Sequence, residues 1–479
     1  MRSSIDRRSF LHRTGGGAIL PAMASGLMAA CTEESANGVL TPRMSKVGNA
    51  GLGNGGYGPL DNDQGVVLLP RGFQVRAFGA VGDPMSDGLP TPIALDGMGA
   101  FDAGQGRVRL VRNHEDRNGP SVAIAADAYD PLAGGGTTTL EVDASRRLVR
   151  DFVSLSGTAV NCAGGPTPWA SWLTCEETVV GPREGFGKTH GWVFEVPAFA
   201  SRPVTPVPLK GLGRFSHEAV AVDPRTGIVY ETEDNAFPPG SGLYRFLPDR
   251  LGLLAEGGRL QMAAVVGEPG LEIFRGSAAG ISVGDTFQVE WVDIEIVDPG
   301  DDGPEADRRA ALFLEGLGKG GVRFDRLEGC WYGQRSIFFH DTRGGARREG
   351  HVWQYEPAGA EGHGGPDDRG LLRLIFESPG PDVLDNPDNI TVSPGGGLVL
   401  CEDGSGVQYV RGLTQGGAIF DFAVNQINDA EFAGACFSPD GKTLFVNIQG
   451  DTRGRATDPG VRGGGMTLAI WGPWEKGAL

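Results

Sequence analysis

Short runs of apolar residues, separated by tight turns, dominate the pattern of this chain. A clear case is the run at 217–222, which is followed by Asp223-Pro224, a turn ending at Gly227, and a second run at 228–232. Such runs are too short for helices, and turn residues such as Asp-Pro, Asp-Gly and Gly bound them. Long stretches with helical periodicity are nearly absent. The pattern therefore predicts an all-β protein built from antiparallel hairpins.

The hairpins form an internal repeat. Each unit has a polar start, an apolar strand, a tight turn, a second apolar strand and a polar end. The units begin near residues 96, 161, 217, 327, 388 and 431. Hairpins repeated at this spacing predict a β-propeller of about six blades. The spacing is uneven, so several blades should carry loop insertions, and the largest insertion is expected between residues 235 and 320.

The N-terminal segment 1–31 is predicted to be an export signal and not part of the folded domain. Arg7-Arg8 is followed by an apolar run that is rich in Gly and Ala, which is typical of a twin-arginine signal. The run ends at Cys31, where both lipidation and simple cleavage are open. We expect a linker over 32–60 and one propeller domain over 61–479. These features predict a periplasmic or secreted protein without a membrane span, either lipid-anchored at Cys31 or released.

The charge balance narrows the range of partners. The formal net charge is −18, and no stripe rich in Lys and Arg appears. Binding to nucleic acid or to an anionic membrane is therefore disfavoured. An excess of acidic residues suits a protein that collects cations. We expect a monomer whose partners are a small-molecule substrate and the twin-arginine export machinery.

Acidic residues recur at equivalent places in the repeat. A hairpin returns the chain to the end where it began, so the polar starts and ends of all units should meet at one mouth of the propeller. The expected starts are Asp96, Cys162, Glu218, Glu328, Asn389 and Glu431. The expected returning ends are Glu115, Glu177, Glu233, Asp234, Glu402 and Asp403. Converging carboxylates repel one another unless cations are bound, which predicts a metal centre. The alternative is a solvated acidic rim.

One cysteine stands among these acids. Cys162 occupies a start position, whereas the other cysteines lie within or beside apolar runs, where a thiol behaves as a small hydrophobe. We expect Cys162 to be a metal ligand. The cysteines expected to pack in the core are Cys175, Cys330, Cys401 and Cys436. Hard oxygen sites suit calcium, and a mixed carboxylate–thiolate site suits iron, zinc or manganese.

Arg326 lies two residues before Glu328, so the alternation of a strand puts both side chains on one face. An arginine beside a metal cluster suits bidentate capture of phosphate oxygens. The alternative role is an ion pair with neighbouring carboxylates. His114 and His217 adjoin acidic positions, and for each of them a role as ligand or proton donor stands beside a structural role.

These stretches together resemble the PhoX alkaline phosphatase family, which is also called the domain-of-unknown-function 839 family. The similarity runs from residue 113 to the C-terminus, and the twin-arginine signal also fits that family. The motifs that carry the resemblance are Asn113-His114-Glu115, Asn161-Cys162-Ala163-Gly164-Gly165-Pro166, Arg214-Phe215-Ser216-His217-Glu218, Arg326-Leu327-Glu328-Gly329, Glu431-Phe432-Ala433-Gly434 and Ile470-Trp471-Gly472-Pro473-Trp474.

The resemblance implies a propeller that holds iron and calcium and hydrolyses phosphate monoesters. Its cluster ligands would fall on Cys162, Glu177, Glu218, Glu328 and Glu431. We add Glu115, Glu233 and Asp403 as metal ligands from the returning ends. Arg326 would grip the phosphate, Glu328 would take part in catalysis, and Asn113 would contact the substrate.

The prediction is therefore a metal-dependent phosphatase, in which cations bind the phosphate oxygens and offset the charge of the transition state. The alternatives are a calcium-dependent propeller lactonase, a phosphodiesterase and a non-catalytic secreted binding propeller. A lactonase needs one cation and no phosphate-gripping arginine, so Cys162 and Arg326 argue against it. A binding propeller needs no convergent cluster.

Overall fold

The computed structural model describes residues 56–452 and 464–479. The predicted export signal, Cys31 and nearly all of the predicted linker lie outside the described residues. The described part is almost entirely β-structure, and its one α-helix is α2 (Glu305–Gly318). Short 3₁₀ turns occupy Pro182–Glu184, Lys210–Leu212, Leu254–Glu256, Ile273–Ala279, Pro366–Asp368 and Trp474–Lys476.

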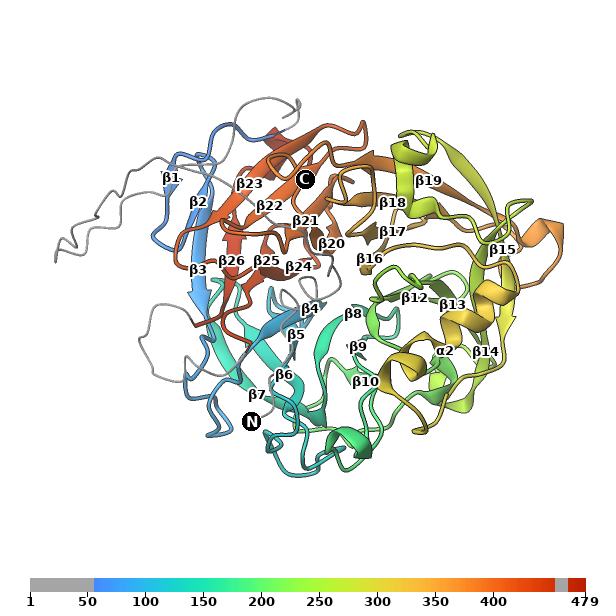
Figure 1. The fold of residues 1–479 in the computed structure, drawn as a ribbon. Helices are drawn as coiled ribbons and strands as arrows, with labels where there is room; N and C mark the ends of the chain where they lie inside the picture. Colours follow the sequence, from blue (N-terminus) through green and yellow to red (C-terminus); the bar gives the residue numbers. More distant parts are fainter. Residues whose placement is uncertain (1–55, 453–463) are drawn as a thin grey trace, which may run out of the picture. The chain divides into compact units, whose positions relative to one another are not determined.

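Six inner strands surround the centre of the molecule (Figure 1). They are β4 (Leu95–Asp102), β8 (Asn161–Pro166), β11 (His217–Val222), β16 (Leu327–Gly333), β20 (Pro387–Val392) and β24 (Phe432–Phe437). Each inner strand contacts the inner strand of the blade before it and of the blade after it, and β24 contacts β4, so the ring is closed. The predicted propeller of about six blades is confirmed.

The remaining strands extend each blade outward by antiparallel pairing. The first blade adds β5 (Val108–His114), β6 (Gly135–Val142) and β7 (Leu148–Thr158), and the second adds β9 (Ser171–Glu176) and β10 (Val193–Pro197). The third adds β12 (Val229–Glu233), β13 (Leu243–Pro248), β14 (Gly258–Val265) and β15 (Thr286–Ile294). The fourth adds β17 (Ser336–Asp341), β18 (His351–Glu356) and β19 (Gly370–Glu377). The fifth adds β21 (Leu398–Glu402), β22 (Tyr409–Leu413), β23 (Ile419–Asn425), β2 (Val67–Leu69) and β1 (Asn62–Asp63).

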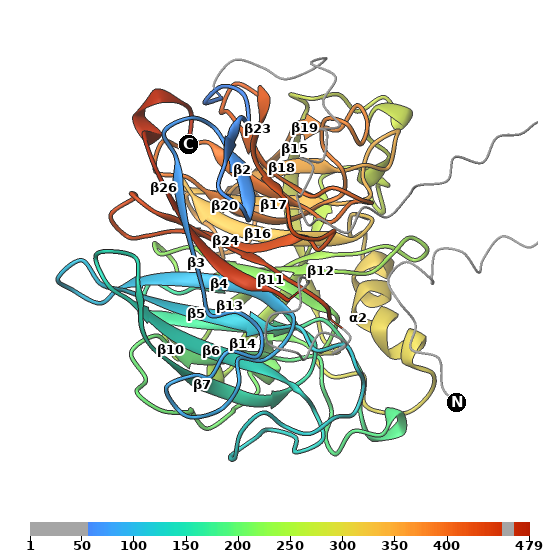
Figure 2. The ribbon, with the colours of Figure 1, turned by 90° about the vertical axis from the view of Figure 1, so that its left-hand side faces the viewer.

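The sixth blade closes the propeller with strands from both ends of the described chain. It contains β25 (Leu444–Ile448), β26 (Met466–Trp471) and the N-terminal strand β3 (Gln74–Phe78). β3 pairs along the whole of its length with β26, from Phe78 opposite Thr467 to Gln74 opposite Trp471. Figure 2 shows these two strands side by side. This pairing joins strands from both ends of the described chain in one blade and so holds the ring closed.

The predicted large insertion belongs to the third blade. It forms β13 to β15 and α2, and β15 pairs with β19, so the third and fourth blades share one nine-stranded sheet. A buried ion cluster fixes this junction, because Arg245 donates to Glu361 at 2.6 Å and to both carboxylate oxygens of Asp368 at 2.9 and 2.7 Å. The insertion therefore extends the sheet and leaves the inner strands in place.

Glycines let the inner strands approach one another closely around the channel. A Cβ atom on Gly97 would lie 2.6 Å from the Cα atom of Ala163, and one on Gly329 would lie 2.6 Å from the carbonyl oxygen of Asp388. Real Cβ atoms do not approach backbone atoms this closely, so larger residues would push neighbouring blades apart. Packing therefore requires glycine at Gly97 and Gly329, which directly follow the expected starts Asp96 and Glu328.

We predict that Gly97→Ala destabilises the fold by about 1–3 kcal/mol, because the added methyl group overpacks the contact between β4 and β8. Chemical denaturation measures this loss. Gly359→Ala is the matched control, because no atom lies within 4 Å of the added Cβ there. Equal stability of the two variants would contradict the close packing of the inner strands.

Candidate metal centre at the propeller mouth

A β-bulge follows the start of every inner strand. In β4 the register shifts between Leu95 and Met98, and the other five inner strands also shift within their first few residues. A bulge adds one residue to a strand and turns its side chains away from the regular alternation. The shift lies between the first and the fourth residue of β4, β8, β11 and β16, so the starts of these four blades share one local geometry at the mouth.

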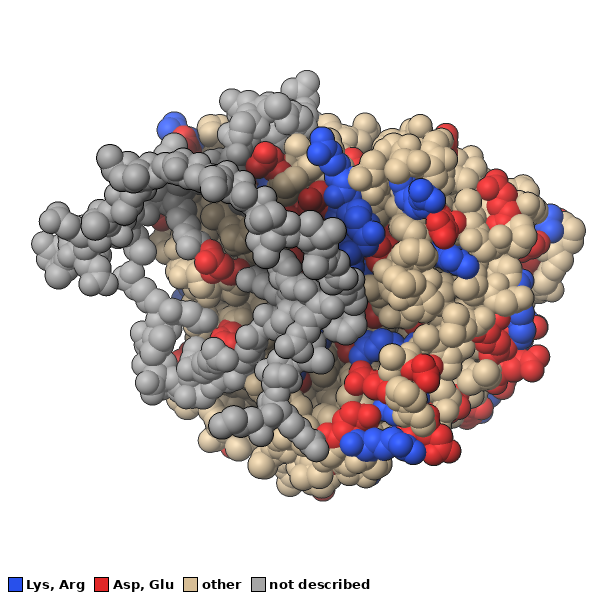
Figure 3. Space-filling view, viewed as in Figure 1, with Lys and Arg blue, Asp and Glu red and all other residues tan. Residues whose placement is uncertain are grey.

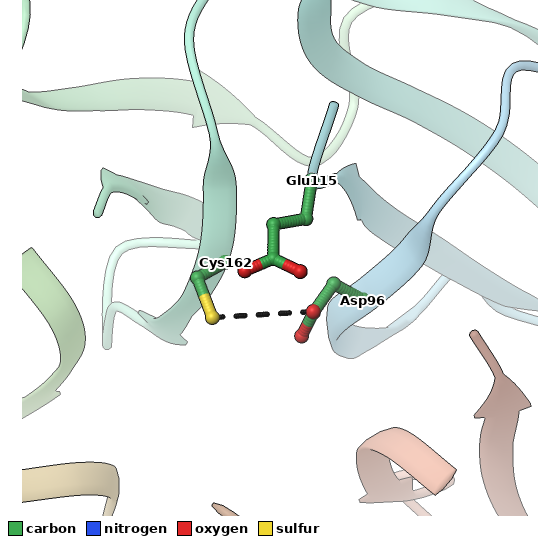
Figure 4. A group of neighbouring side chains, drawn as sticks. All are labelled: Asp96, Glu115 and Cys162. Carbon is green, nitrogen blue, oxygen red and sulfur yellow. Dashed lines mark hydrogen bonds between the residues drawn. The ribbon is translucent and has the colours of Figure 1, made fainter. Parts of the chain in front are cut away.

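Acidic residues and one thiol gather at this mouth in four overlapping groups. Within each group, one ligand atom from every residue lies within 4.8 Å of the others. The groups are Asp96, Glu115 and Cys162; Cys162, Glu177 and Glu218; Glu218, Glu328 and Asp388; and Asp388, Asp403 and Glu431. The first is drawn in Figure 4, where Glu115 points between the side chains of Cys162 and Asp96. Shared members join the four groups into one arc, which we call the mouth arc.

The mouth arc is buried, and this burial makes its charge costly. Glu218 and Glu328 are 0% exposed, and Cys162 is 1% exposed. The Cys162 Sγ atom lies 2.9 Å from Glu218 Oε1 and 3.9 Å from Asp96 Oδ2. Burial raises the pKa of the Cys162 thiol far above its usual value, and Asp96 and Glu218 raise it further. Bound cations would reverse this effect by favouring thiolate and carboxylate together, so the donor set fits metal ions.

The returning ends of the six hairpins lie beside the starts of the inner strands. The backbone amide of each one donates to the carbonyl that lies just before the inner strand of the same blade, for example Glu115 to Ala94 at 2.8 Å and Glu177 to Val160 at 2.9 Å. The six equivalent residues are Glu115, Glu177, Asp234, Thr342, Asp403 and Gln449. Three of these carry carboxylates that join the mouth arc, namely Glu115, Glu177 and Asp403.

The expectation that Glu233 is a ligand is corrected by the structure. Its carboxylate is directed into the third blade, where it accepts hydrogen bonds from the Gly242 amide at 3.0 Å and the Tyr244 hydroxyl at 2.9 Å. Burial raises the pKa of Glu233 to about 8. The next residue, Asp234, occupies the returning position and bonds Arg326. Adjacent residues of a strand face opposite sides, which explains why only one of the two reaches the mouth.

Asn113 is placed differently from the expectation that it contacts substrate. It is fully buried, its Nδ2 donates to the carbonyls of Cys162 and Ala163 at 2.9 and 2.8 Å, and its Oδ1 accepts from Trp172 at 2.9 Å. All of these contacts lie within the protein. Asn113 therefore ties β5 to β8 and fixes the backbone that carries Cys162.

Two start positions differ in register from the expected pattern. In the fifth blade Asp388, rather than Asn389, joins the arc, while Asn389 accepts from the Gly434 amide at 2.9 Å. In the sixth blade Glu431 lies directly before its strand, at the place that Arg326 holds in the fourth blade. Glu431 still joins the arc, in the group with Asp388 and Asp403.

Arg326 lies at the edge of the arc with its guanidinium held by carboxylates. Its Nε and Nη2 atoms donate to the two oxygens of Asp234 at 2.8 and 2.9 Å, and Nη2 also donates to Glu328. A second arginine, Arg117, bridges Glu115 and Glu177 on the opposite part of the arc. Each arginine thus reaches a member of the arc, and the forked pair with Asp234 fixes the plane of Arg326.

The other four cysteines and the two histidines have structural roles in packing and hydrogen bonding. Cys175, Cys330, Cys401 and Cys436 are buried free thiols in hydrophobic clusters, as their apolar sequence neighbours suggested. His114 bonds the Ile93 carbonyl and the Thr138 hydroxyl, and His217 bonds the Gly213 carbonyl. Burial lowers the pKa of both histidines. Among the described residues, neither histidine belongs to the groups that could hold a metal ion.

Sequence reasoning missed Asp388 as a ligand and Arg117 entirely. Asp388 is the second residue of its inner strand, as Cys162, Glu218 and Glu328 are of theirs, so a stricter alignment of the repeats would have found it. Arg117 follows Glu115 by two residues in a loop after β5. Its contact with Glu177 depends on how two blades are placed, which the repeat pattern does not show.

The fold and the mouth arc together define a β-propeller with a candidate metal centre at one end of its channel. The chain matches the family model "Alkaline phosphatase PhoX" over residues 55–451. It therefore belongs to the PhoX alkaline phosphatase family, whose members are metal-dependent phosphatases, and it is an enzyme of this class.

A solved structure of a PhoX protein shares the fold of this chain. PhoX of Pseudomonas fluorescens, in complex with vanadate as a transition-state analogue, is 19% identical, covers 90% of this chain and 98% of its own, and gives a TM-score of 0.61. A gluconolactonase of Xanthomonas campestris is 12% identical, covers 83% of this chain and 98% of its own, and gives a TM-score of 0.43. No curated protein sequence matches the chain. None of the helices in the described ranges is long and apolar enough to cross a membrane.

We predict that Cys162→Ser lowers the metal content per chain, because the substitution removes the one thiol of the mouth arc while it keeps the size of the residue. Elemental analysis of purified protein measures the loss. Cys436→Ser is the control, since Cys436 is equally buried but lies in a hydrophobic cluster. Normal metal content in the Cys162 variant would remove the thiol from the list of ligands.

Proposed function

We propose that this chain is an exported phosphatase that hydrolyses phosphate monoesters at a mixed iron and calcium centre in the mouth arc. The observation that carries the proposal is the chain of four overlapping ligand groups, with carboxylates throughout and one thiol near one end. So many buried acids in one place are suited to several cations rather than to one. Membership of the PhoX family supports the reaction class.

The chemistry of the donors suggests how the two metals would be divided. The groups that contain Cys162 combine sulfur with carboxylate oxygens and suit iron. The groups around Asp388 contain only carboxylates and suit calcium. When bound, the cations would supply positive charge for the phosphate oxygens and for the charge that grows in the transition state. Three residues, Cys162, Glu218 and Asp388, belong to two groups each, so each would contribute to two neighbouring cation sites.

Arg326 has the geometry of a group that positions phosphate beside this centre. Its side chain is 16% exposed, and it lies between the arc residue Glu328 and the outer residue Asp234. Asp234 orients the guanidinium plane through two parallel hydrogen bonds. A phosphate bound at the arc would therefore meet an oriented donor, and positioned donors of this kind contribute to phosphoryl transfer. Glu328, which contacts both the arc and Arg326, links metal binding to substrate binding.

The export route belongs to the same proposal. Arg7-Arg8 and the apolar run before Cys31 support passage through the twin-arginine machinery. Such export would suit a protein that is folded with its metals before it leaves the cytoplasm. We propose a periplasmic or secreted monomer that acts on small phosphorylated substrates.

We predict that natively exported protein contains iron and calcium together and hydrolyses phosphate monoesters in proportion to its metal content. Chelation should abolish turnover, and adding back both ions should restore it, because the carboxylates and the thiol of the arc would bind the ions again. Elemental analysis beside a panel of mono- and diesters is the measurement. Full activity with only trace iron would contradict the mixed centre, and a preference for diesters would shift the reaction class.

We predict that Arg326→Lys lowers turnover per bound metal about a hundred- to a thousandfold, because lysine keeps the charge but lacks the planar fork. The measurement is kcat per metal centre, beside a melting curve. If Arg326 served only as the ion-pair partner of Asp234, the variant would lose stability or metal, while the metal-loaded fraction would keep its rate. Arg309→Lys is a control at an arginine that bonds Ser216 and Glu305 outside the arc.

A further inference from the structure

A basic loop lies at the mouth side of the fourth blade. Residues 342–350 connect β17 to β18 and contain Arg343, Arg347 and Arg348, although the chain as a whole carries a formal net charge of −18. The loop begins at Thr342, a returning position where four of the other five blades place an acid. Figure 3 shows Lys and Arg side chains gathered on this face. The mouth is therefore lined by the acidic residues of the mouth arc, and a basic loop lies at one side of it.

Arg343 lies beside Arg326 because backbone hydrogen bonds connect the segment 342–343 to the segment 325–326. The Thr342 amide donates to the Arg326 carbonyl at 2.9 Å, and the Arg343 amide donates to the Asp325 carbonyl at 3.2 Å. Arg326 in turn reaches Glu328 of the mouth arc. The loop thus brings a second arginine next to the one that we assign to phosphate.

The carboxylates nearby already have arginine partners other than Arg343. Asp234 pairs with Arg326 through two hydrogen bonds, and Asp325 accepts from Arg348 at 2.5 Å. In the part of the chain that the structure describes, the Arg343 side chain makes no hydrogen bond and no ion pair.

The surroundings of Arg343 favour an anion. The side chain is partly buried. Burial lowers the pKa of Arg343, and the neighbouring Arg348 and Arg326 lower it further, while Asp325 and Asp234 offset part of this effect. A partly desolvated guanidinium without a hydrogen-bonded carboxylate is a strong donor to an incoming carboxylate or phosphate.

The loop holds this arginine on a fixed backbone. The Gly345 amide donates to the Phe274 carbonyl at 2.7 Å, and the Ala346 amide donates to Glu377 Oε1 at 3.1 Å. A Cβ on Gly344 would lie 2.3 Å from His351 Nδ1, so the chain passes through a space that only glycine fits. A group on such a fixed backbone binds with little loss of backbone entropy.

We propose that Arg343 forms an anion-binding subsite next to Arg326, and that this subsite takes a second anionic group carried by the alcohol part of the substrate. The inference rests on the proposed phosphatase function and names its substrate class. The favoured substrates are phosphate monoesters whose leaving alcohol bears a carboxylate or another phosphate. Monoesters with a neutral alcohol leave the subsite unused and are bound less tightly.

Two aryl esters test the subsite, phenyl phosphate and 4-carboxyphenyl phosphate, with metal-loaded protein. We expect the wild-type chain to have the lower KM for the carboxylated ester. Arg343→Met should raise that KM about tenfold, the loss expected for one charge-assisted hydrogen bond at a partly exposed site. The KM for phenyl phosphate should stay the same, because Arg343 does not touch the transferred phosphate in this account.

Arg347→Met is the matched control, because it removes the same charge from the same loop at an exposed side chain. An equal effect of both substitutions on the carboxylated ester would overturn the subsite in favour of a general field of the loop. An equal rise in KM for both esters in the Arg343 variant would overturn it too. If the wild-type chain hydrolyses both esters with the same KM, the subsite alone fails; if it hydrolyses neither, the proposed phosphatase function fails.

Discussion

The mutual repulsion of the buried carboxylates in the mouth arc is the strongest physical constraint on this structure. The mouth arc collects acids from all six blades, and most of its members have almost no contact with water. Without compensation, each negative charge there raises the cost of the next. Arg117 and Arg326 supply part of the compensation through direct ion pairs. Bound cations would add to this compensation, which fits the metal dependence of the PhoX family.

The rest of the propeller holds this arc at a fixed size. The pairing of β3 with β26 closes the ring, and Gly97 and Gly329 allow neighbouring inner strands to approach closely. In five blades the arc residue at the start of the hairpin is the second residue of the inner strand, at the bulge, and in the sixth blade it is Glu431, directly before the strand. Expansion of the ring would separate Cys162 from Glu218 and Glu218 from Asp388, and would break the continuity of the ligand groups. The close packing of glycines between the inner strands therefore maintains the distances that metal binding at the mouth requires.

The sequence was sufficient for the fold and for most of the arc, since both follow from a local repeat. Alternating apolar runs and turns determine the hairpins, and the polar start of each hairpin marks a position at the mouth. Two of the failures are shifts of register, since Glu233 and Asn389 stand one residue from Asp234 and Asp388. Asn113 differs because its side chain is occupied by contacts between β5 and the second blade, which the repeat does not show. The contact of Arg117 with Glu177 joins two blades and depends on tertiary structure alone.

Anomalous X-ray diffraction from crystals of the exported, active protein tests the central claim most directly. Data collected on both sides of the iron absorption edge, and at a long wavelength where calcium scatters anomalously, would locate each metal. The account predicts an iron peak at the Cys162 end of the mouth arc and calcium peaks among Glu218, Asp388 and Glu431. Active crystals without anomalous density at the arc, or with all of their metal bound elsewhere, would contradict it.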